Sequence, residues 1–346
     1  MSRAERPAFY AQPEAEQIRG LETLAREALQ AWALGDAGLA PVAYRENMTF
    51  RVEAGARGRF ALRIHQAGYR SDAEIASELA FMGALREGGV ATPEVVAARD
   101  GAPFVRATSP AVPEPRQCDL FEWIEGRPLR ATGAALSLPD EELARVYADV
   151  GRQAASIANI AEAWQRPPGF TRPVWDAEGI FGATAQLGDW RRLARLAPAQ
   201  RALLDRLAER LRTDLAAFGR TPDRFGLCHG DFLPENLMLG DTGLRLLDFD
   251  DCGEGWTLLD FATAVFDLLG EPSFDACLGA LVAGFRERRA LAEEQLARLP
   301  TFLLARALSY LGWSATRSHL RKAEEIAPRL LAALEAFAPA YLGESG

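Results

Sequence analysis

Residues 229–251 read HGDFLPENLMLGDTGLRLLDFDD, and this stretch decides the fold. It sets a histidine, an aspartate and an asparagine in a short loop, then places aspartates directly after an apolar run. Acidic and amide groups beside strand-like segments are costly unless they are paired or bind a cation. The stretch therefore either holds a tight turn together or holds a metal ion and its ligand.

The loop has the spacing of a phosphoryl-transfer catalytic loop. His229, Asp231 and Asn236 fit H-x-D-x-x-x-x-N, and Asp248 stands in an Asp-Phe-Asp where such enzymes carry a Mg²⁺-binding aspartate. Mg²⁺ takes oxygen ligands and usually only one or two protein carboxylates. Asn236 and Asp248 would supply these oxygens, while Asp231 would orient an acceptor hydroxyl and receive its proton. Each residue alone is more often a turn cap or strand end, but the joint spacing favours catalysis.

Composition sets the class of protein and excludes some partners. The chain has 346 residues, of which 49% are hydrophobic and 25% charged, as in ordinary globular proteins. Its formal net charge of -9 argues against broad nucleic-acid binding, which needs basic surfaces. Neutral or cationic small molecules remain compatible partners.

Cysteines and apolar runs indicate the compartment. The four cysteines form no CxxC pair, so reduced, buried thiols are expected. The N-terminal MSRAERPAFYAQPEAE is charged and contains proline, so it is not expected to be a signal peptide. The run TFLLARALSYLGW contains Arg306 and is shorter than the ~20 apolar residues of a membrane helix. We therefore predict a cytoplasmic protein without a membrane partner, either a monomer or a homodimer.

The residue pattern changes near Gly126 from mainly strand-like to mainly helical. Residues 14–35 and 71–88 have helical patterns, and strands are expected in VAYRENMTFRVEA, RFALRIH, VATPEVVAA, APFVRA and QCDLFEWIEG. SPAVPEP, residues 109–115, is typical of a linker. Later helical patterns cover 139–164, 198–218, 256–269, 273–289, 292–318 and 324–341. A β-rich part therefore precedes a mainly helical part, which predicts an α+β protein.

HGDFLPEN, LLDFDD and GWTLLDFA resemble the aminoglycoside phosphotransferase family. This family has the bilobal protein-kinase-like fold and includes choline kinases, type II homoserine kinases and a bacterial stress-response Ser/Thr kinase. The resemblance runs from about Tyr44 to the last helices. It implies a nucleotide-binding lobe with a leading helix over 1–125, a helical catalytic and substrate lobe over 126–346, and ATP and Mg²⁺ as cofactors.

The resemblance also implies supporting roles. An aspartate like Asp260 braces the catalytic loop through its backbone in this family; the alternative is an ordinary acid in the first turn of a helix. His229 is expected to pack inside the loop without transferring protons. His65 and His319 are expected to be structural or solvent-facing.

On the nucleotide side, the resemblance places Arg63 of FALRIH against the phosphates and Glu78 of SELAFM beside it. An arginine departs from the usual protein-kinase lysine, but a guanidinium also pairs bidentately with carboxylate and phosphate. Surface charges are the alternative for both residues. The glycine-rich loop is replaced by YRENMTFRV, where Asn47 would contact phosphate or simply lie in a hairpin connection.

LFEWIEG resembles the hinge between the lobes. Backbone groups of Glu122 and Ile124 would meet the adenine edge, with Phe121 behind it; the alternative is a buried strand that ends in a turn. On the acceptor side, Trp175 and Asp176 would contact a hydroxylated or cationic ligand or form a structural lid. Asp250 would add negative potential near the acceptor or only tune the metal site.

These features predict an ATP-dependent phosphotransferase that moves the γ-phosphoryl group to a hydroxyl of a small metabolite. Homoserine, an amino alcohol, a sugar and an aminoglycoside-like compound are all open as acceptors. The alternatives are a Ser/Thr protein kinase of the stress-response type, which autophosphorylation would reveal, and a catalytically silent nucleotide-binding regulatory module. The Arg63 substitution supports the silent module, whereas the complete set of Asp231, Asn236 and Asp248 argues against it.

Overall fold

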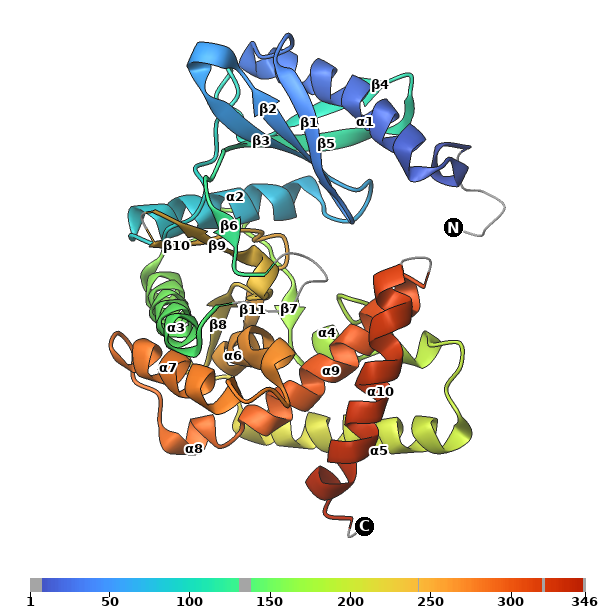
Figure 1. Cartoon of the computed structure of the whole chain (residues 1–346), viewed down its shortest axis with the longest axis vertical. Helices are drawn as coiled ribbons and strands as arrows, with labels where there is room; N and C mark the ends of the chain where they lie inside the picture. Colours follow the sequence, from blue (N-terminus) through green and yellow to red (C-terminus); the bar gives the residue numbers. More distant parts are fainter. Residues whose placement is uncertain (1–7, 131–137, 242, 319–320, 345–346) are drawn as a thin grey trace. The chain divides into compact units, whose positions relative to one another are not determined.

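The structure is a computed structural model that describes residues 8–130, 138–241, 243–318 and 321–344 (Figure 1). The chain forms two compact units. Unit 1 contains Met1–Arg127, Gln165–Thr171 and Met238–Asp250, and unit 2 contains Pro128–Trp164, Arg172–Leu237 and Asp251–Gly346. The boundary expected between 125 and 126 lies close to the end of the first segment, but two later segments also pack in unit 1.

Unit 1 is built on a five-stranded antiparallel sheet in the order β1-β2-β3-β5-β4. Its strands are β1 (Gly38–Tyr44), β2 (Met48–Glu53), β3 (Arg59–Ile64), β4 (Val105–Ser109) and β5 (Val112–Glu122). Alternate residues of β2, Met48, Phe50 and Val52, are buried in one core cluster with α1 (Glu14–Leu29). The helix lies along one face of the sheet (Figure 1).

The second helix of unit 1, α2 (Asp72–Glu87), begins at a capping box. The Ser71 hydroxyl accepts the Glu74 backbone N–H at 3.3 Å, and the Glu74 carboxylate accepts the Ser71 N–H at 2.8 Å. This exchange satisfies two N–H groups that a helix start otherwise leaves open. The predicted start of this helix is confirmed.

Smaller elements lie mostly in the segments of unit 1, apart from Pro128 and Leu237 at their ends. Strands β9 (Leu237–Gly240) and β10 (Gly243–Leu246) belong to a sheet in the order β10-β9-β6, where β6 is Arg127–Pro128. The short 3₁₀ helices are η1 (Ala8–Ala11), η2 (Gln30–Trp32) and η3 (Gly55–Arg57). The β10 strand leads directly to the Asp-Phe-Asp segment.

Unit 2 is mainly helical. Its helices are α3 (Asp140–Ala163), α4 (Ala177–Phe181), α5 (Pro198–Phe218), α6 (Thr257–Val265), α7 (Phe274–Arg286), α8 (Glu293–Leu296), α9 (Leu299–Thr316) and α10 (Arg321–Leu342), and its 3₁₀ helices are η4 (Trp190–Arg192), η5 (Pro234–Asn236) and η6 (Phe266–Leu268). A small sheet has the order β7-β11-β8, formed by β7 (Val174–Trp175), β11 (Gly253–Trp256) and β8 (Phe225–Cys228).

Helices α3 and α7 pack at very close range. A Cβ added at Gly151 would lie 2.0 Å from the Leu281 carbonyl oxygen, and one added at Gly284 would lie 2.0 Å from the Ala148 carbonyl oxygen. Both glycines are therefore required by the approach of the two backbones. Helix α3 also packs against β8 and α6. The candidate catalytic loop follows β8 and is contacted by Asp260 of α6.

The predicted α+β class is confirmed, while three local predictions are wrong. VATPEVVAA forms only an isolated bridge at Val95, because Pro93 removes a ladder donor. SPAVPEP is not a linker but the end of β4, a tight turn and the start of β5. The helix expected over 292–318 is divided into α8 and α9, and Pro300 lies in the first turn of α9, where proline is tolerated.

The expectations about thiols and membrane helices can also be compared with the structure. All four cysteines are buried and lie outside any disulfide, as predicted. Within the described ranges, every helix is too short or too polar to cross a membrane. His319 lies outside the described residues.

Candidate active site

The loop that follows β8 in unit 2 brings Asp231 and Asn236 together. The Asn236 side-chain nitrogen Nδ2 donates to the Asp231 carboxylate at 2.8 Å and to the Asp231 backbone carbonyl at 3.0 Å. Because Nδ2 is committed to Asp231, the Asn236 oxygen Oδ1 is the atom left to serve as a ligand. The contact also holds the half-buried Asp231 carboxylate in one orientation.

Asp260 on α6 braces this loop through its backbone. Its fully buried carboxylate accepts the His229 N–H at 2.9 Å and the Gly230 N–H at 2.8 Å. Gly230 has φ +81°, and a Cβ there would lie 2.3 Å from the Asp251 carbonyl oxygen. His229 is also fully buried, and its Nδ1 accepts the Asp231 N–H at 3.2 Å. The His-Gly-Asp backbone is therefore fixed from several sides.

Arg306 on α9 is a part of this brace that motif analysis missed. Its side chain is fully buried, and its Nε donates to the Thr263 hydroxyl at 2.7 Å. Its Nη2 donates to the Gly230 carbonyl oxygen, so this peptide is held at both its N–H and its C=O. The only signal in the sequence was an arginine inside an apolar helical run, which is costly unless the charge has partners.

The brace predicts a pH dependence. Burial raises the pKa of Asp260 to about 6, although the N–H groups of Gly230 and His229 and the charge of Arg306 act in the opposite direction. Protonation turns one of the two accepting oxygens into a hydroxyl, which is a weaker acceptor, so one N–H bond of the brace is weakened and kcat is expected to fall below about pH 6. Carboxyl ¹³C NMR, assigned with the Asp260→Asn variant, should show a midpoint near pH 6. A midpoint near 4 would contradict this assignment.

Protonation of Asp260 is expected to lower kcat but to raise the free energy of unfolding. Because folding raises this pKa above its unfolded value, the folded state binds the proton more tightly. The contribution of Asp260 to the free energy of unfolding is therefore largest below about pH 4 and declines as the pH rises to about 6.

In unit 1, Arg63 on β3 is held by two carboxylates. Its Nη1 lies 2.8 Å from Glu78 Oε1, as the resemblance to kinases implied. Its Nε and Nη2 also form two hydrogen bonds, of 3.0 and 2.7 Å, with Asp119 on β5. A guanidinium has five N–H donors, of which the two hydrogen bonds and the ion pair engage three. Glu78 and Asp119 are fully buried, which excludes the surface-charge alternative for Glu78.

Asp119 was not found by sequence analysis, although it pairs with Arg63 in the β3–β5 register. His65, expected to be structural or solvent-facing, is buried, and its Nε2 lies 2.9 Å from Asp119 Oδ2. Burial raises the pKa of Asp119, but the positive charge of Arg63 and the hydrogen bonds from Arg63 and His65 outweigh it and hold that pKa well below its usual range. An isolated acid in an apolar strand was the available signal.

Replacing Asp119 by asparagine is expected to destabilise the protein by about 3–5 kcal/mol, because it breaks a buried charge pair and leaves the other charge without its main partner. Urea unfolding measures this free energy. The matched control is Glu16→Gln, which breaks an exposed ion pair with Arg19 and is expected to cost less than about 1 kcal/mol. Equal effects of the two variants would show that Asp119 is not the anchor of Arg63.

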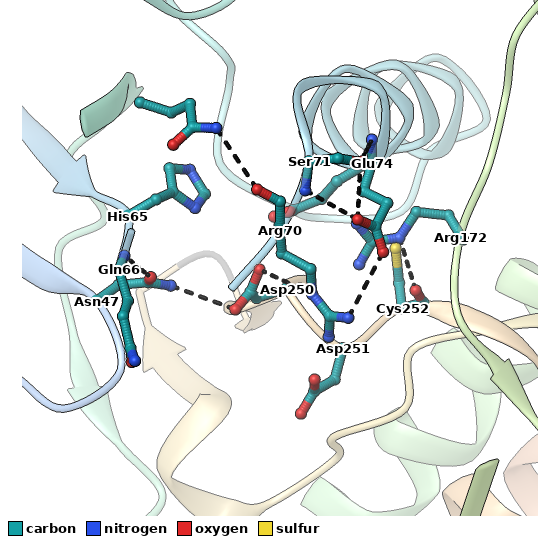
Figure 2. A network of polar contacts seen from close by, with 12 residues as sticks. Asn47, His65, Gln66, Arg70, Ser71, Glu74, Arg172, Asp250, Asp251 and Cys252 are labelled. Atoms are coloured by element: carbon teal, nitrogen blue, oxygen red, sulfur yellow. Dashed lines mark hydrogen bonds and ion pairs between the residues drawn. The ribbon is translucent and has the colours of Figure 1, made fainter. Parts of the chain in front are cut away.

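Asn47 and Asp250 also meet in unit 1 (Figure 2). The Asn47 Nδ2 donates to Asp250 Oδ2 at 3.3 Å, and the Gln66 N–H donates to Asn47 Oδ1 at 3.1 Å. On the other side, Arg70 Nε lies 3.7 Å from Asp250 Oδ1. Asp250 therefore connects the turn between β1 and β2 to the residue that precedes the α2 cap.

Asp248 has a backbone conformation that few residues adopt. It is exposed, and its φ of 62° lies in the left-handed region, where only one other non-glycine residue of the described chain lies. Such conformations cost of order 1–3 kcal/mol and cluster at functional sites. An exposed carboxylate is a hard oxygen donor of the kind that Mg²⁺ takes, and the role of Asp248 as a metal ligand stays a prediction. No group of three or more His, Cys, Asp or Glu that could hold a metal is found among the described residues.

The predicted hinge keeps part of its backbone open. The Glu122 N–H donates to the Glu94 carbonyl oxygen at 2.9 Å, so only the Glu122 carbonyl can meet an adenine edge. Phe121 is buried beneath the Arg63 guanidinium, whose carbon lies 5.0 Å from the ring centre. Ile124 is also buried. The hinge assignment stays a prediction, narrowed to the Glu122 carbonyl and the Ile124 backbone.

Trp175 and Asp176 have structural contacts. Trp175 is fully buried, and its indole N–H donates to the Asp251 carbonyl oxygen at 2.8 Å. Asp176 caps α4 by accepting the Gly179 N–H at 2.9 Å and pairs with Arg220 at 2.9 Å. These contacts favour the structural alternative over direct contact with an acceptor.

Comparison with known proteins gives a consistent result. The model of the phosphotransferase enzyme family matches residues 39–296. An uncharacterized protein of Deinococcus radiodurans is 33% identical over 281 residues, which are 79% of this chain and 75% of that protein. The structure of a microcompartment-associated aminopropanol kinase is 34% identical, has a TM-score of 0.80, and matches over 93% of this chain and 98% of that chain.

A more distant structure shares the fold alone. An amicoumacin kinase solved with AMP-PNP and Ca²⁺ is 17% identical, with a TM-score of 0.72 and a match over 95% of each chain. The predicted protein-kinase-like fold is confirmed by these likenesses.

Proposed function

We propose, because the chain belongs to the phosphotransferase enzyme family, that it moves the γ-phosphoryl group of ATP to the hydroxyl of a small amino alcohol. That the chain is a small-molecule kinase follows from the family and from its kinase relatives. The main structural support for this reaction is the hydrogen bond of 2.8 Å from the Asn236 amide, which orients the Asp231 carboxylate. The use of ATP and the class of the acceptor are proposed in addition to this activity.

Asp231 is the proposed base of the reaction. Its carboxylate would accept the proton of the acceptor hydroxyl and orient the oxygen for in-line attack on the γ-phosphorus. Phosphoryl transfer depends mainly on positioning and charge stabilisation, so the rigid backbone around Gly230 matters as much as the acid. Asp260 and Arg306 supply this rigidity from α6 and α9.

The nucleotide would be held by residues of unit 1. Further N–H donors of Arg63 would meet phosphate oxygens, and Glu78 and Asp119 would keep the guanidinium in place. Asn236 and Asp248 would hold Mg²⁺, which neutralises charge on the phosphates when bound. Asn47 is fixed by Asp250 and Gln66, and these contacts would support the turn between β1 and β2 if it meets the phosphates as proposed.

The acceptor class rests on similarity in sequence and fold. The aminopropanol kinase is 34% identical and matches nearly the whole of this chain. The acidic balance of this protein is compatible with a cationic acceptor. Homoserine, sugars and aminoglycosides remain as competitors within the same reaction class.

A panel of hydroxyl compounds tests the proposal. The protein is incubated with ATP and Mg²⁺, and ADP release is measured for 1-amino-2-propanol, ethanolamine, choline, homoserine, a hexose and an aminoglycoside. The highest kcat/KM is expected for an amino alcohol with a primary amine, namely 1-amino-2-propanol or ethanolamine. A preference for a sugar or an aminoglycoside would overturn the acceptor class, and labelled phosphate on the protein itself would favour the protein-kinase alternative.

A further inference from the structure

Lys322 at the start of α10 lies beside the candidate catalytic loop. Its Nζ is 3.4 Å from Oε1 of Glu235, the residue directly before Asn236. Only 7% of the Glu235 side chain is exposed, against 37% of the Lys322 side chain. Lys322 is the single lysine of the chain, in which all other strong cations are arginines.

Glu235 belongs to a group of four charges. Arg130 Nη2 lies 3.1 Å from each Glu235 oxygen and also forms an ion pair with Asp267. Two cations, Arg130 and Lys322, therefore balance two carboxylates, Glu235 and Asp267. Loss of the Lys322 charge would leave two carboxylates facing one guanidinium. An unbalanced carboxylate that is largely buried is costly, so Glu235 would be driven to move.

Movement of Glu235 would reach the reacting groups through the backbone. Glu235 lies in the single-turn helix η5, between Pro234 and Asn236. The Arg130 N–H donates to the Pro234 carbonyl oxygen at 3.3 Å, and the Asn236 N–H donates to the Leu233 carbonyl oxygen at 2.8 Å. The loop thus has little freedom to rotate Glu235 without shifting Asn236, whose amide holds Asp231.

We propose that Lys322 is a positioning residue whose positive charge holds the catalytic loop through Glu235, so that removal of the charge lowers turnover. The inference rests on the proposed function, because it concerns the loop that carries Asp231. It assigns to α10 a role in the catalytic rate as well as in packing. Acylation of the Lys322 amine, which removes its charge, is therefore expected to lower turnover.

The first test compares two substitutions on α10. Lys322→Met removes the charge and keeps an unbranched chain, and kcat is expected to fall roughly 10- to 100-fold, with the KM for ATP changed much less. Lys322→Arg restores the charge and is expected to recover most of the turnover. Arg329 is an exposed cation on the same helix, and Arg329→Met is the matched control, with kcat expected to stay within about twofold of wild type.

The second test uses the chemistry of the one lysine side chain. Acetic anhydride forms an amide between Lys322 Nζ and the acyl carbon, releases acetate, and removes the positive charge. Reductive methylation with formaldehyde and a borane adds methyl groups and keeps the charge. Acetylated protein is expected to lose turnover and methylated protein to retain it. The Lys322→Arg variant, treated in the same way, reports reactions at the N-terminus and at hydroxyls.

Hydrogen exchange separates this inference from the proposed function. Faster exchange of the amides of residues 231–237 in Lys322→Met than in wild type would support the proposal even if no acceptor is turned over. Unchanged exchange there, with a change confined to α10, would show a purely structural role and overturn it. A kcat for Lys322→Met equal to that of wild type would overturn it as well.

Discussion

Replacing Asp231 by asparagine is expected to lower kcat by roughly 10²- to 10⁴-fold, which is the usual contribution of a positioned general base. The asparagine oxygen can still accept the hydrogen bond from Asn236 Nδ2, so the loop should keep its shape. The variant loses only the ability to take a proton from the acceptor hydroxyl. Steady-state kinetics with the preferred amino alcohol measure the effect.

Asp241→Asn is the matched control for this prediction. Asp241 is exposed in the turn between β9 and β10, so the same loss of one negative charge should leave kcat within about twofold of wild type. Thermal unfolding of both variants should match wild type within a few degrees. A fully active Asp231→Asn enzyme would remove this residue from its proposed role.

Replacing Asp248 by asparagine is expected to abolish the gain in nucleotide affinity that Mg²⁺ provides. Calorimetry of ATP binding with Mg²⁺ and with EDTA should give the same affinity in the variant, whereas in wild type Mg²⁺ should strengthen binding by roughly 10- to 100-fold. Asparagine adopts the left-handed conformation readily, so the φ of 62° should be kept. The experiment therefore reports the lost carboxylate charge and not a changed backbone.

Asp248→Gly gives an independent check on the backbone. Glycine removes the cost of the left-handed conformation, so this variant is expected to be no less stable than wild type while it also loses the response to Mg²⁺. Undiminished binding of MgATP by either variant would refute Asp248 as a metal ligand.

Local signals in the sequence predicted much of the fold. Helix α5 has the predicted bounds, 198–218, because Pro198 suits a first helical position and Gly219 suits the residue after the last. The β2–β3 hairpin followed from two alternating segments rich in strand-forming residues on either side of the GARG turn. Very short strands such as β7 and β11 were not predicted, because a strand of four residues or fewer has too little periodicity to be recognised in a sequence.

The candidate site was predicted only where function imposes a spacing. The pattern from His229 to Asp248 is local in the chain, so the order of the residues is enough to recognise it. Asp119 and Arg306 could not be found in this way. Asp119 meets Arg63 from 56 residues away, and Arg306 meets Gly230 from 76 residues away. Their roles depend on strand register and helix packing, which the sequence pattern did not specify.

The central claim is that this chain moves a phosphoryl group from ATP to a small amino alcohol. It is tested most directly by ³¹P NMR of the wild-type protein with ATP, Mg²⁺ and 1-amino-2-propanol. We predict a phosphomonoester signal that grows as the γ-phosphorus signal of ATP declines, and that is absent without the amino alcohol. Conversion of ATP to ADP and inorganic phosphate alone, at a rate that the amino alcohol does not change, would contradict the claim.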